Sequence, residues 1–226
     1  MYATCAIAVL TAASLTTHAT ADVDRVSVDL GWFMNIGNGQ IYYDGPFAQW
    51  VSSGFEPGST YNTVTGIDVQ GILSSLGYAA LAGITITDTG ANVYGTLSPG
   101  ADVDLLRVTG VDPDAVLAFA YDGPNAIHSD EPAWALQWRT ANVDSFSGAQ
   151  EWDWTHVSLG RLGTLTATFL EPQRLGDNAP FLALSEAGSF ESYFVSLDAI
   201  VPAPGALSVL AAAALLPRRR RRATRR

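Results

Sequence analysis

Residues 164–170 read Thr-Leu-Thr-Ala-Thr-Phe-Leu, in which hydroxyl and apolar side chains alternate up to Phe169. A period of two places the threonines on one face of an extended chain and the apolar side chains on the other, so this stretch predicts a half-buried β-strand. Similar runs of β-branched, apolar and aromatic residues occur at 26–33, 83–87, 103–108, 115–121, 134–138, 155–159 and 192–197. The chain is therefore expected to form many short strands.

Turn-forming residues separate these runs. They stand at 38–39, 44–46, 56–58, 98–100, 112–114, 122–124 and 176–178. Only residues 69–82 suit a helical turn or two, because their glycines disfavour a long helix. Many short strands with frequent turns predict an all-β fold, a single antiparallel β-sandwich of the jelly-roll kind, over residues 22–199.

The first 21 residues predict a secretory signal peptide. They contain no Asp, Glu, Lys or Arg, and an apolar run at 5–15 precedes the small residues Ala19-Thr20-Ala21. This order is typical of a segment removed by signal peptidase, here before Asp22. The only cysteine, Cys5, leaves with that segment, so the exported domain is expected to contain no disulfide and to use no thiolate chemistry.

Charge divides the chain sharply. Residues 22–198 hold all 22 acidic residues and five arginines, a net charge of −17, and the sequence contains no lysine. Such a domain repels nucleic acid and anionic membrane surfaces, which argues against a nucleic-acid partner. The other seven arginines fall within the last nine residues.

Residues 200–226 form a third region. The motif Val201-Pro202-Ala203-Pro204 precedes an apolar run at 205–216 and then Pro217. A basic cluster follows, made of Arg218, Arg219, Arg220, Arg221 and Arg222. The apolar run is shorter than the ~20 residues that a spanning helix needs, and the arginines resist transfer across the bilayer. We expect a short membrane-embedded segment that is processed, not a permanent anchor.

This region resembles a PEP-CTERM sorting signal, although Ala203 replaces the more frequent Glu and Pro217 ends the apolar run. The resemblance implies an exosortase-type enzyme in the inner membrane of a bacterium that makes extracellular polysaccharide. It also implies cleavage near the Pro-x-Pro motif and release to the cell surface or matrix. Residues 98–104 and 157–169, with Glu191 ahead of the last predicted strand, are similar to stretches of uncharacterised β-sandwich ectodomains that carry such signals.

Four aspartates form two Asp-x-Asp pairs on either side of one predicted strand. They are Asp102, Asp104, Asp112 and Asp114. Calcium needs six to eight oxygen ligands, and alternating aspartates supply several at once. The alternative is that Asp is simply abundant and turn-forming in an acidic protein. The expectation is thus no cofactor, with calcium as the alternative.

Two tryptophan pairs are candidates for carbohydrate binding. They are Trp134 with Trp138 and Trp152 with Trp154. On strands, the two members of each pair project to one face, where sugar rings stack on exposed aromatic rings. The alternative, which we favour, is that these rings fill the core of the sandwich.

The stretch from Glu151 to His156 resembles the Glu-x-Asp-x-x-Glu strand of jelly-roll β-glucanases. A retaining glycosidase needs two carboxyl groups, and His156 stands where the second would be. No Gly-x-Ser-x-Gly elbow occurs either, so we expect no catalytic residue.

Together these features predict an exported, non-enzymatic protein of the cell envelope or extracellular matrix. The precursor would be tethered at the inner membrane and then released by exosortase-type processing. A carbohydrate- or calcium-binding module is the alternative, and a glycosidase-like enzyme comes third. The expected partners are signal peptidase, the exosortase-type enzyme and extracellular polysaccharide.

Overall fold

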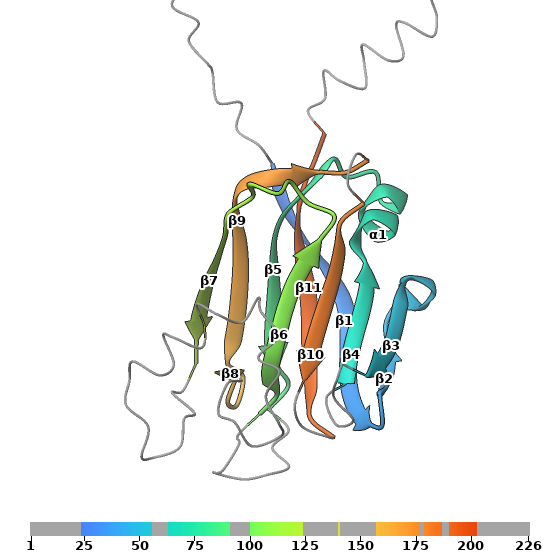
Figure 1. Cartoon of the computed structure of the whole chain (residues 1–226), viewed down its shortest axis with the longest axis vertical. Coiled ribbons are helices and arrows are strands. Elements are labelled where there is room, and N and C mark those ends of the chain that lie inside the picture. Colours follow the sequence, from blue (N-terminus) through green and yellow to red (C-terminus); the bar gives the residue numbers. More distant parts are fainter. Residues whose placement is uncertain are drawn as a thin grey trace, which may run out of the picture.

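A computed structural model describes residues 24–55, 63–90, 100–123, 140, 157–176, 179–186 and 190–202 of the 226. Within these ranges the chain forms two antiparallel sheets and one α-helix (Figure 1). The predicted all-β fold is confirmed.

The strands fall into a six-stranded and a five-stranded sheet. They are β1 (Arg25–Gly37), β2 (Gln40–Asp44), β3 (Val51–Phe55), β4 (Thr63–Asp68), β5 (Ala80–Asp88), β6 (Asp102–Thr109), β7 (Leu117–Asp122), β8 (Val157–Ser158), β9 (Thr164–Arg174), β10 (Phe181–Glu186) and β11 (Ser192–Ile200). Sheet A has the order β2-β1-β11-β5-β9-β7, and sheet B has the order β3-β4-β10-β6-β8. A 3-10 turn, η1 (Ala48–Trp50), joins β2 to β3.

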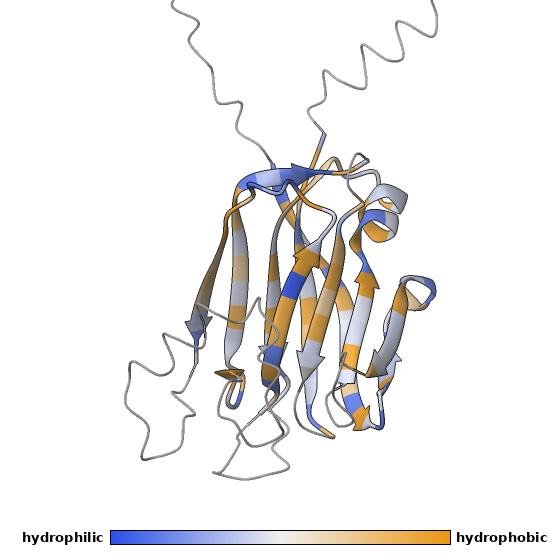
Figure 2. Ribbon diagram, in the orientation of Figure 1, coloured by the Kyte–Doolittle hydropathy of each residue, from blue (hydrophilic) through white to orange (hydrophobic). Residues whose placement is uncertain are grey.

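Strand β9 has the alternation that the sequence predicts. Leu165, Ala167 and Phe169 are buried in the core, whereas the threonines between them are half-buried on the other face. Figure 2 shows apolar residues in short bands along the strands, between more polar positions. Burial of one face of each sheet is the main favourable contribution to folding in such a sandwich.

The two sheets are joined by a core that includes buried aromatic rings. Phe33 of β1 and Tyr193 of β11 stack with their ring centroids 5.6 Å apart and their planes 2° from parallel. The Tyr193 hydroxyl lies 3.2 Å from Oγ1 of Thr65, which belongs to the opposite sheet. This hydrogen bond satisfies two buried polar groups and fixes the tyrosine across the core.

Helix α1 (Val69–Ser75) occupies the first half of the predicted helical stretch. The Asp68 side chain caps it by accepting a hydrogen bond from the Gly71 backbone N–H at 2.8 Å. Val69, Ile72 and Leu73 bury one face of the helix. The second half of the stretch turns at Gly77 and enters β5.

Tyr43 ties an irregular part of β1 to the turn before η1. Its hydroxyl donates to the Leu30 carbonyl at 2.6 Å and accepts from the Phe47 N–H at 3.1 Å. Burial raises the pKa of this phenol above its usual value, and the carboxylates of Asp29 and Asp44 raise it further, against an opposing effect of the Phe47 hydrogen bond. The neutral tyrosine is therefore the form that the fold prefers.

The two ends of the described domain meet at one pole of the sandwich. Arg25 of β1 pairs with Ile200 of β11, and the Val201 N–H donates to the Asp24 carbonyl at 3.0 Å. We call this end the terminal pole. The opposite end, where β5 finishes at Asp88 and β6 and β11 begin, is the loop pole (Figure 1).

Candidate functional site

The predicted sorting motif begins at the edge of the folded domain. Val201 is 37% exposed and Pro202 is half-buried, while Ala203, Pro204 and the arginine cluster at 218–222 lie outside the described residues. The hydrogen bond from Val201 to Asp24 extends the pairing of the last strand by one residue. The motif thus follows β11 with no intervening linker.

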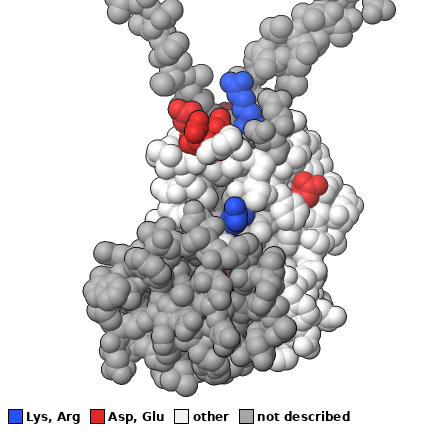
Figure 3. All heavy atoms as spheres, viewed as in Figure 1, with Lys and Arg blue, Asp and Glu red and all other residues white. Residues whose placement is uncertain are grey.

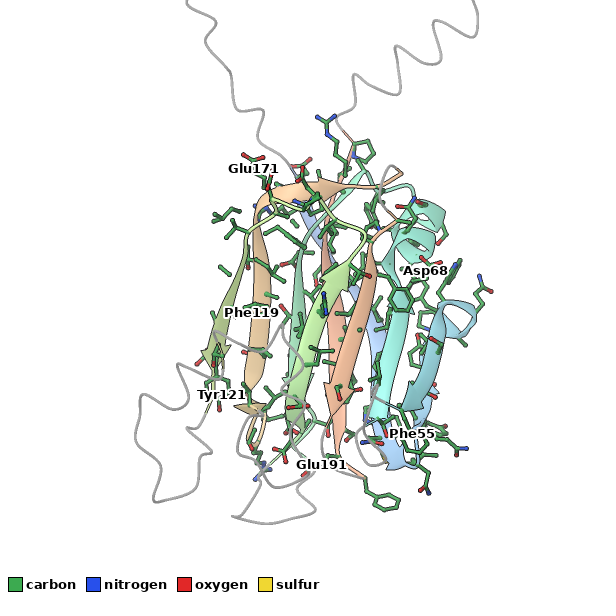
Figure 4. All side chains as sticks on the ribbon, viewed as in Figure 1. Phe55, Asp68, Phe119, Tyr121, Glu171 and Glu191 are labelled. Carbon is green, nitrogen blue, oxygen red and sulfur yellow. The ribbon has the colours of Figure 1, made fainter. Side chains whose placement is uncertain are left out.

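Charged side chains of both signs lie near the terminal pole. Figure 3 shows acidic and basic groups close together near this end, and Figure 4 places Glu171 there. Arg174 of β9 is also at this end, because it pairs with Ala80 at the beginning of β5. The pole therefore carries mixed charge.

The structure does not bring the two Asp-x-Asp pairs together. Asp102 and Asp104 are buried at the loop-pole end of β6, whereas Asp112 and Asp114 are exposed beyond the other end of that strand. A strand of this length spans roughly 23 Å, so the four carboxylates cannot share one calcium ion. Across the described ranges, no three His, Cys, Asp or Glu side chains converge as metal ligands would.

Each pair has local contacts instead. Ser158 of β8 donates its hydroxyl proton to Oδ1 of Asp102 at 2.5 Å, and these two residues are also partners in the strand register. In the other pair, Oδ1 of Asp112 accepts from the Asp114 N–H at 2.9 Å and closes a turn. The turn at Asp112 matches the alternative interpretation of turn-forming aspartates, whereas Asp102 and Asp104 are buried within β6.

Asp88 is a site that the sequence analysis missed. It is fully buried at the end of β5. Its Oδ1 accepts from the N–H groups of Gly90 at 2.6 Å and Leu162 at 3.1 Å, and its Oδ2 accepts from the Ala101 N–H at 3.0 Å. One carboxylate therefore holds three backbone segments at the loop pole, a structural role of the kind that buried, fully hydrogen-bonded charges have.

Glu191, which the sequence analysis noted ahead of the last strand, lies at the loop pole as well (Figure 4). Its side chain is fully buried, and its backbone carbonyl accepts from the Asn35 N–H at 3.2 Å. Thr89 and Ser192 join the same end through their hydroxyls, 2.6 Å apart. The loop pole thus contains several buried polar groups.

The remaining candidates lie outside the described residues. They are Trp134, Trp138, Trp152 and Trp154, together with Glu151, Asp153 and His156 of the glucanase-like stretch. Carbohydrate binding by the tryptophan pairs stays a prediction.

A different aromatic group does stand on the described surface. Trp32 of β1 and Tyr42 of β2 meet edge to face, with ring centroids 5.3 Å apart and an interplanar angle of 62°. Phe194 of β11 is the register partner of Trp32. Tyr42 is 51% exposed and Phe194 is 43% exposed, so these rings form an open aromatic group on the outer face of sheet A.

Comparison of the chain with protein-family models, curated proteins and solved structures found no match. In the described ranges, no helix has the length and apolar character needed to cross a membrane.

Proposed function

We propose that the chain is an exported, non-enzymatic protein of the cell envelope or extracellular matrix, released by exosortase-type processing of its C-terminal segment. The observation that carries this proposal is the position of the Pro-x-Pro motif at the edge of the domain. Asp24, two residues after the proposed N-terminal cleavage point, and Val201, the first residue of the motif, are hydrogen-bonded at the terminal pole.

This arrangement has a consequence for the tethered precursor. Only four residues, 201–204, separate Ile200 from the apolar run. Extended, they reach roughly 15 Å, so the terminal pole would stand close to the membrane and the loop pole would point away from it. A cleaving enzyme would then act in the narrow space between the domain and the bilayer.

We also propose that the sandwich is a jelly roll. The strand order supports this, since β1-β11-β5-β9 form the centre of one sheet and β4-β10-β6-β8 form most of the other. Successive strands β4, β5 and β6 pass from sheet to sheet and back, as in interleaved Greek keys.

Replacing Pro202 and Pro204 by alanine tests the processing proposal. In the native host, the double variant is expected to accumulate as an uncut precursor in the inner-membrane fraction, because the five arginines resist translocation and the cleavage motif is gone. Peptide mass mapping and cell fractionation measure this. Deletion of residues 202–226 is expected to release the domain.

The matched control is Pro172→Ala, an exposed proline within β9, which should be processed like the parent. Mature protein that still ends in the arginine cluster would contradict the proposal. The segment would then be a simple tail anchor.

A further inference from the structure

The register of sheet A aligns side chains in a row across all six strands. From β2 to β7 the row consists of Asp44, Trp32, Phe194, Thr87, Thr164 and Asp122. Directly paired residues of neighbouring strands lie about 5 Å apart, so the row extends over roughly 24 Å. It begins with the aromatic group and continues with hydroxyl groups.

A second row lies beside it, one pleat closer to the terminal pole. From β1 to β7 it consists of Asp29, Ser196, Thr85, Thr166 and Ala120. Oγ1 of Thr85 and Oγ1 of Thr166 are 3.4 Å apart and hydrogen-bond across the two central strands. Gly83 and Thr168 are register partners beyond this pair, so the β5–β9 part of the face is hydroxyl-rich and low in relief.

None of these outward side chains belongs to the buried core, and every member of the two rows is half-buried or exposed. The face is therefore accessible over its whole width. Large exposed aromatic residues gathered on one surface indicate a binding site more often than isolated ones do.

The chemistry of the face suits sugar rings. An aromatic ring offers an apolar face on which the C–H face of a sugar stacks, and Tyr and Trp also carry a polar group that tolerates water around the ligand. Threonine and serine hydroxyls both donate and accept, so a row of them matches the hydroxyls of a carbohydrate without selecting a charge. The two kinds of group are adjacent here, since Phe194 pairs directly with Thr87.

Charge selects among possible ligands. The first row ends in carboxylates on both sides, Asp44 and Asp122, and the second begins with Asp29 and ends with Ala120; neither row contains a basic side chain. Anionic polysaccharides would meet like charge at these edges. Two copies of this face would also oppose each other's carboxylates, which disfavours self-association through it.

We propose that the outer face of sheet A binds a neutral polysaccharide chain, with Trp32, Tyr42 and Phe194 stacking against sugar rings and Thr85, Thr87 and Thr166 bonding to sugar hydroxyls. These residues are other than the tryptophan pairs considered from the sequence. It does not depend on how the C-terminal segment is processed.

The test uses the full chain and a panel of defined polysaccharides. Retention is measured by sedimentation with amorphous cellulose and by affinity electrophoresis in soluble β-glucan, xylan and galactomannan, with alginate as the anionic comparison. We expect retention by at least one neutral member and weaker retention by alginate. Phe194→Ala is expected to weaken binding about fivefold to tenfold, the effect of losing one stacked ring.

Two further variants make the result specific. Phe181→Ala removes a phenylalanine of similar exposure, 38%, from β10 of the opposite sheet, and should leave binding unchanged. Thr85→Val with Thr166→Val keeps the shape of the face and removes two hydroxyls, and should weaken binding while thermal melting shows an intact fold.

Three outcomes would overturn the proposal. One is no retention of the folded chain by any neutral polysaccharide of the panel. Another is equal loss of binding in Phe181→Ala and Phe194→Ala. The third is a change of oligomeric state in Phe194→Ala, measured by sedimentation velocity, which would assign the face to contact between copies of the chain.

Discussion

Replacing Asp88 by alanine would remove the acceptor from three backbone N–H groups at once. The Ala101 N–H is buried, whereas those of Gly90 and Leu162 are partly buried and water can reach them after the change. Each buried donor that loses its partner lowers the free energy of unfolding by about 1–3 kcal/mol, and the loss is near the upper end of this range when the acceptor is charged. Because water can replace the lost acceptor at the Gly90 and Leu162 N–H groups, we expect the free energy of unfolding to fall by about 3–5 kcal/mol in total.

Urea denaturation followed by tryptophan fluorescence measures this loss. A domain of this kind has a free energy of unfolding of about 5–15 kcal/mol. The variant should therefore be mainly folded without urea, and its urea midpoint should lie well below that of the parent. Asp112→Ala is the matched control, because that aspartate is exposed and its side chain accepts one bond, from the neighbouring Asp114 N–H. It should lower stability by about 1 kcal/mol or less.

A loss in Asp88→Ala no larger than that of Asp112→Ala would refute the reasoning. The three loop-pole segments would then be held by other contacts, and the buried carboxylate would contribute no net stability. In that case the desolvation cost of burying the charge would equal what its hydrogen bonds contribute.

Other predictions concern the core and the turns. The pKa of the Tyr43 phenol is raised in the folded state, so the stability that the neutral phenol contributes is present below the ordinary tyrosine pKa and is lost as the pH rises through the higher folded pKa. Between about pH 9 and about pH 11, Tyr43→Phe should therefore lose less free energy of unfolding than the parent does. Urea midpoints measured across this pH range check the prediction. Gly100→Ala should cost about 2 kcal/mol or more, because its φ is +83° and a Cβ would stand 2.9 Å from Oδ2 of Asp88. Gly77 has φ +78° and open space around it, so Gly77→Ala should lose only the stability that backbone strain costs, about 1 kcal/mol. Equal losses of stability in Gly77→Ala and Gly100→Ala would contradict the steric argument. Tyr193→Phe should lower the thermal midpoint by an amount equivalent to about 1 kcal/mol, and an unchanged midpoint would mean that its hydroxyl bond to the opposite sheet is not needed.

Strands with strict alternation could be predicted from the sequence, and strands that depend on distant contacts could not. The runs at 26–33, 83–87, 103–108, 164–170 and 192–197 all lie within observed strands. Strand β4 was missed because Gly66 lowers its strand propensity. The structure gives the reason for that glycine, since a Cβ there would stand 2.7 Å from the Phe181 ring of β10.

The candidate sites divide in the same way. The sequence analysis treated the four aspartates as calcium ligands or as abundant, turn-forming residues. It could not tell that Asp102 and Asp104 are buried within β6, or that this strand separates the two pairs. Asp88 gave no local signal, because an aspartate before Thr89-Gly90 is typical of any turn. The rows on sheet A depend on the order of six strands, and no single run of sequence contains that information.

The pairing of the first strand with the last has a mechanical consequence. Because β1 and β11 are antiparallel neighbours whose free ends meet at the terminal pole, a force that pulls the two termini apart acts along the inter-strand hydrogen bonds. The bonds would break one after another, beginning with the bond between Val201 and Asp24 and continuing from Arg25 and Ile200, and would not be sheared together. A chain held from both ends would thus yield at low force, whereas a chain held only by its C-terminal segment carries no load through this pair.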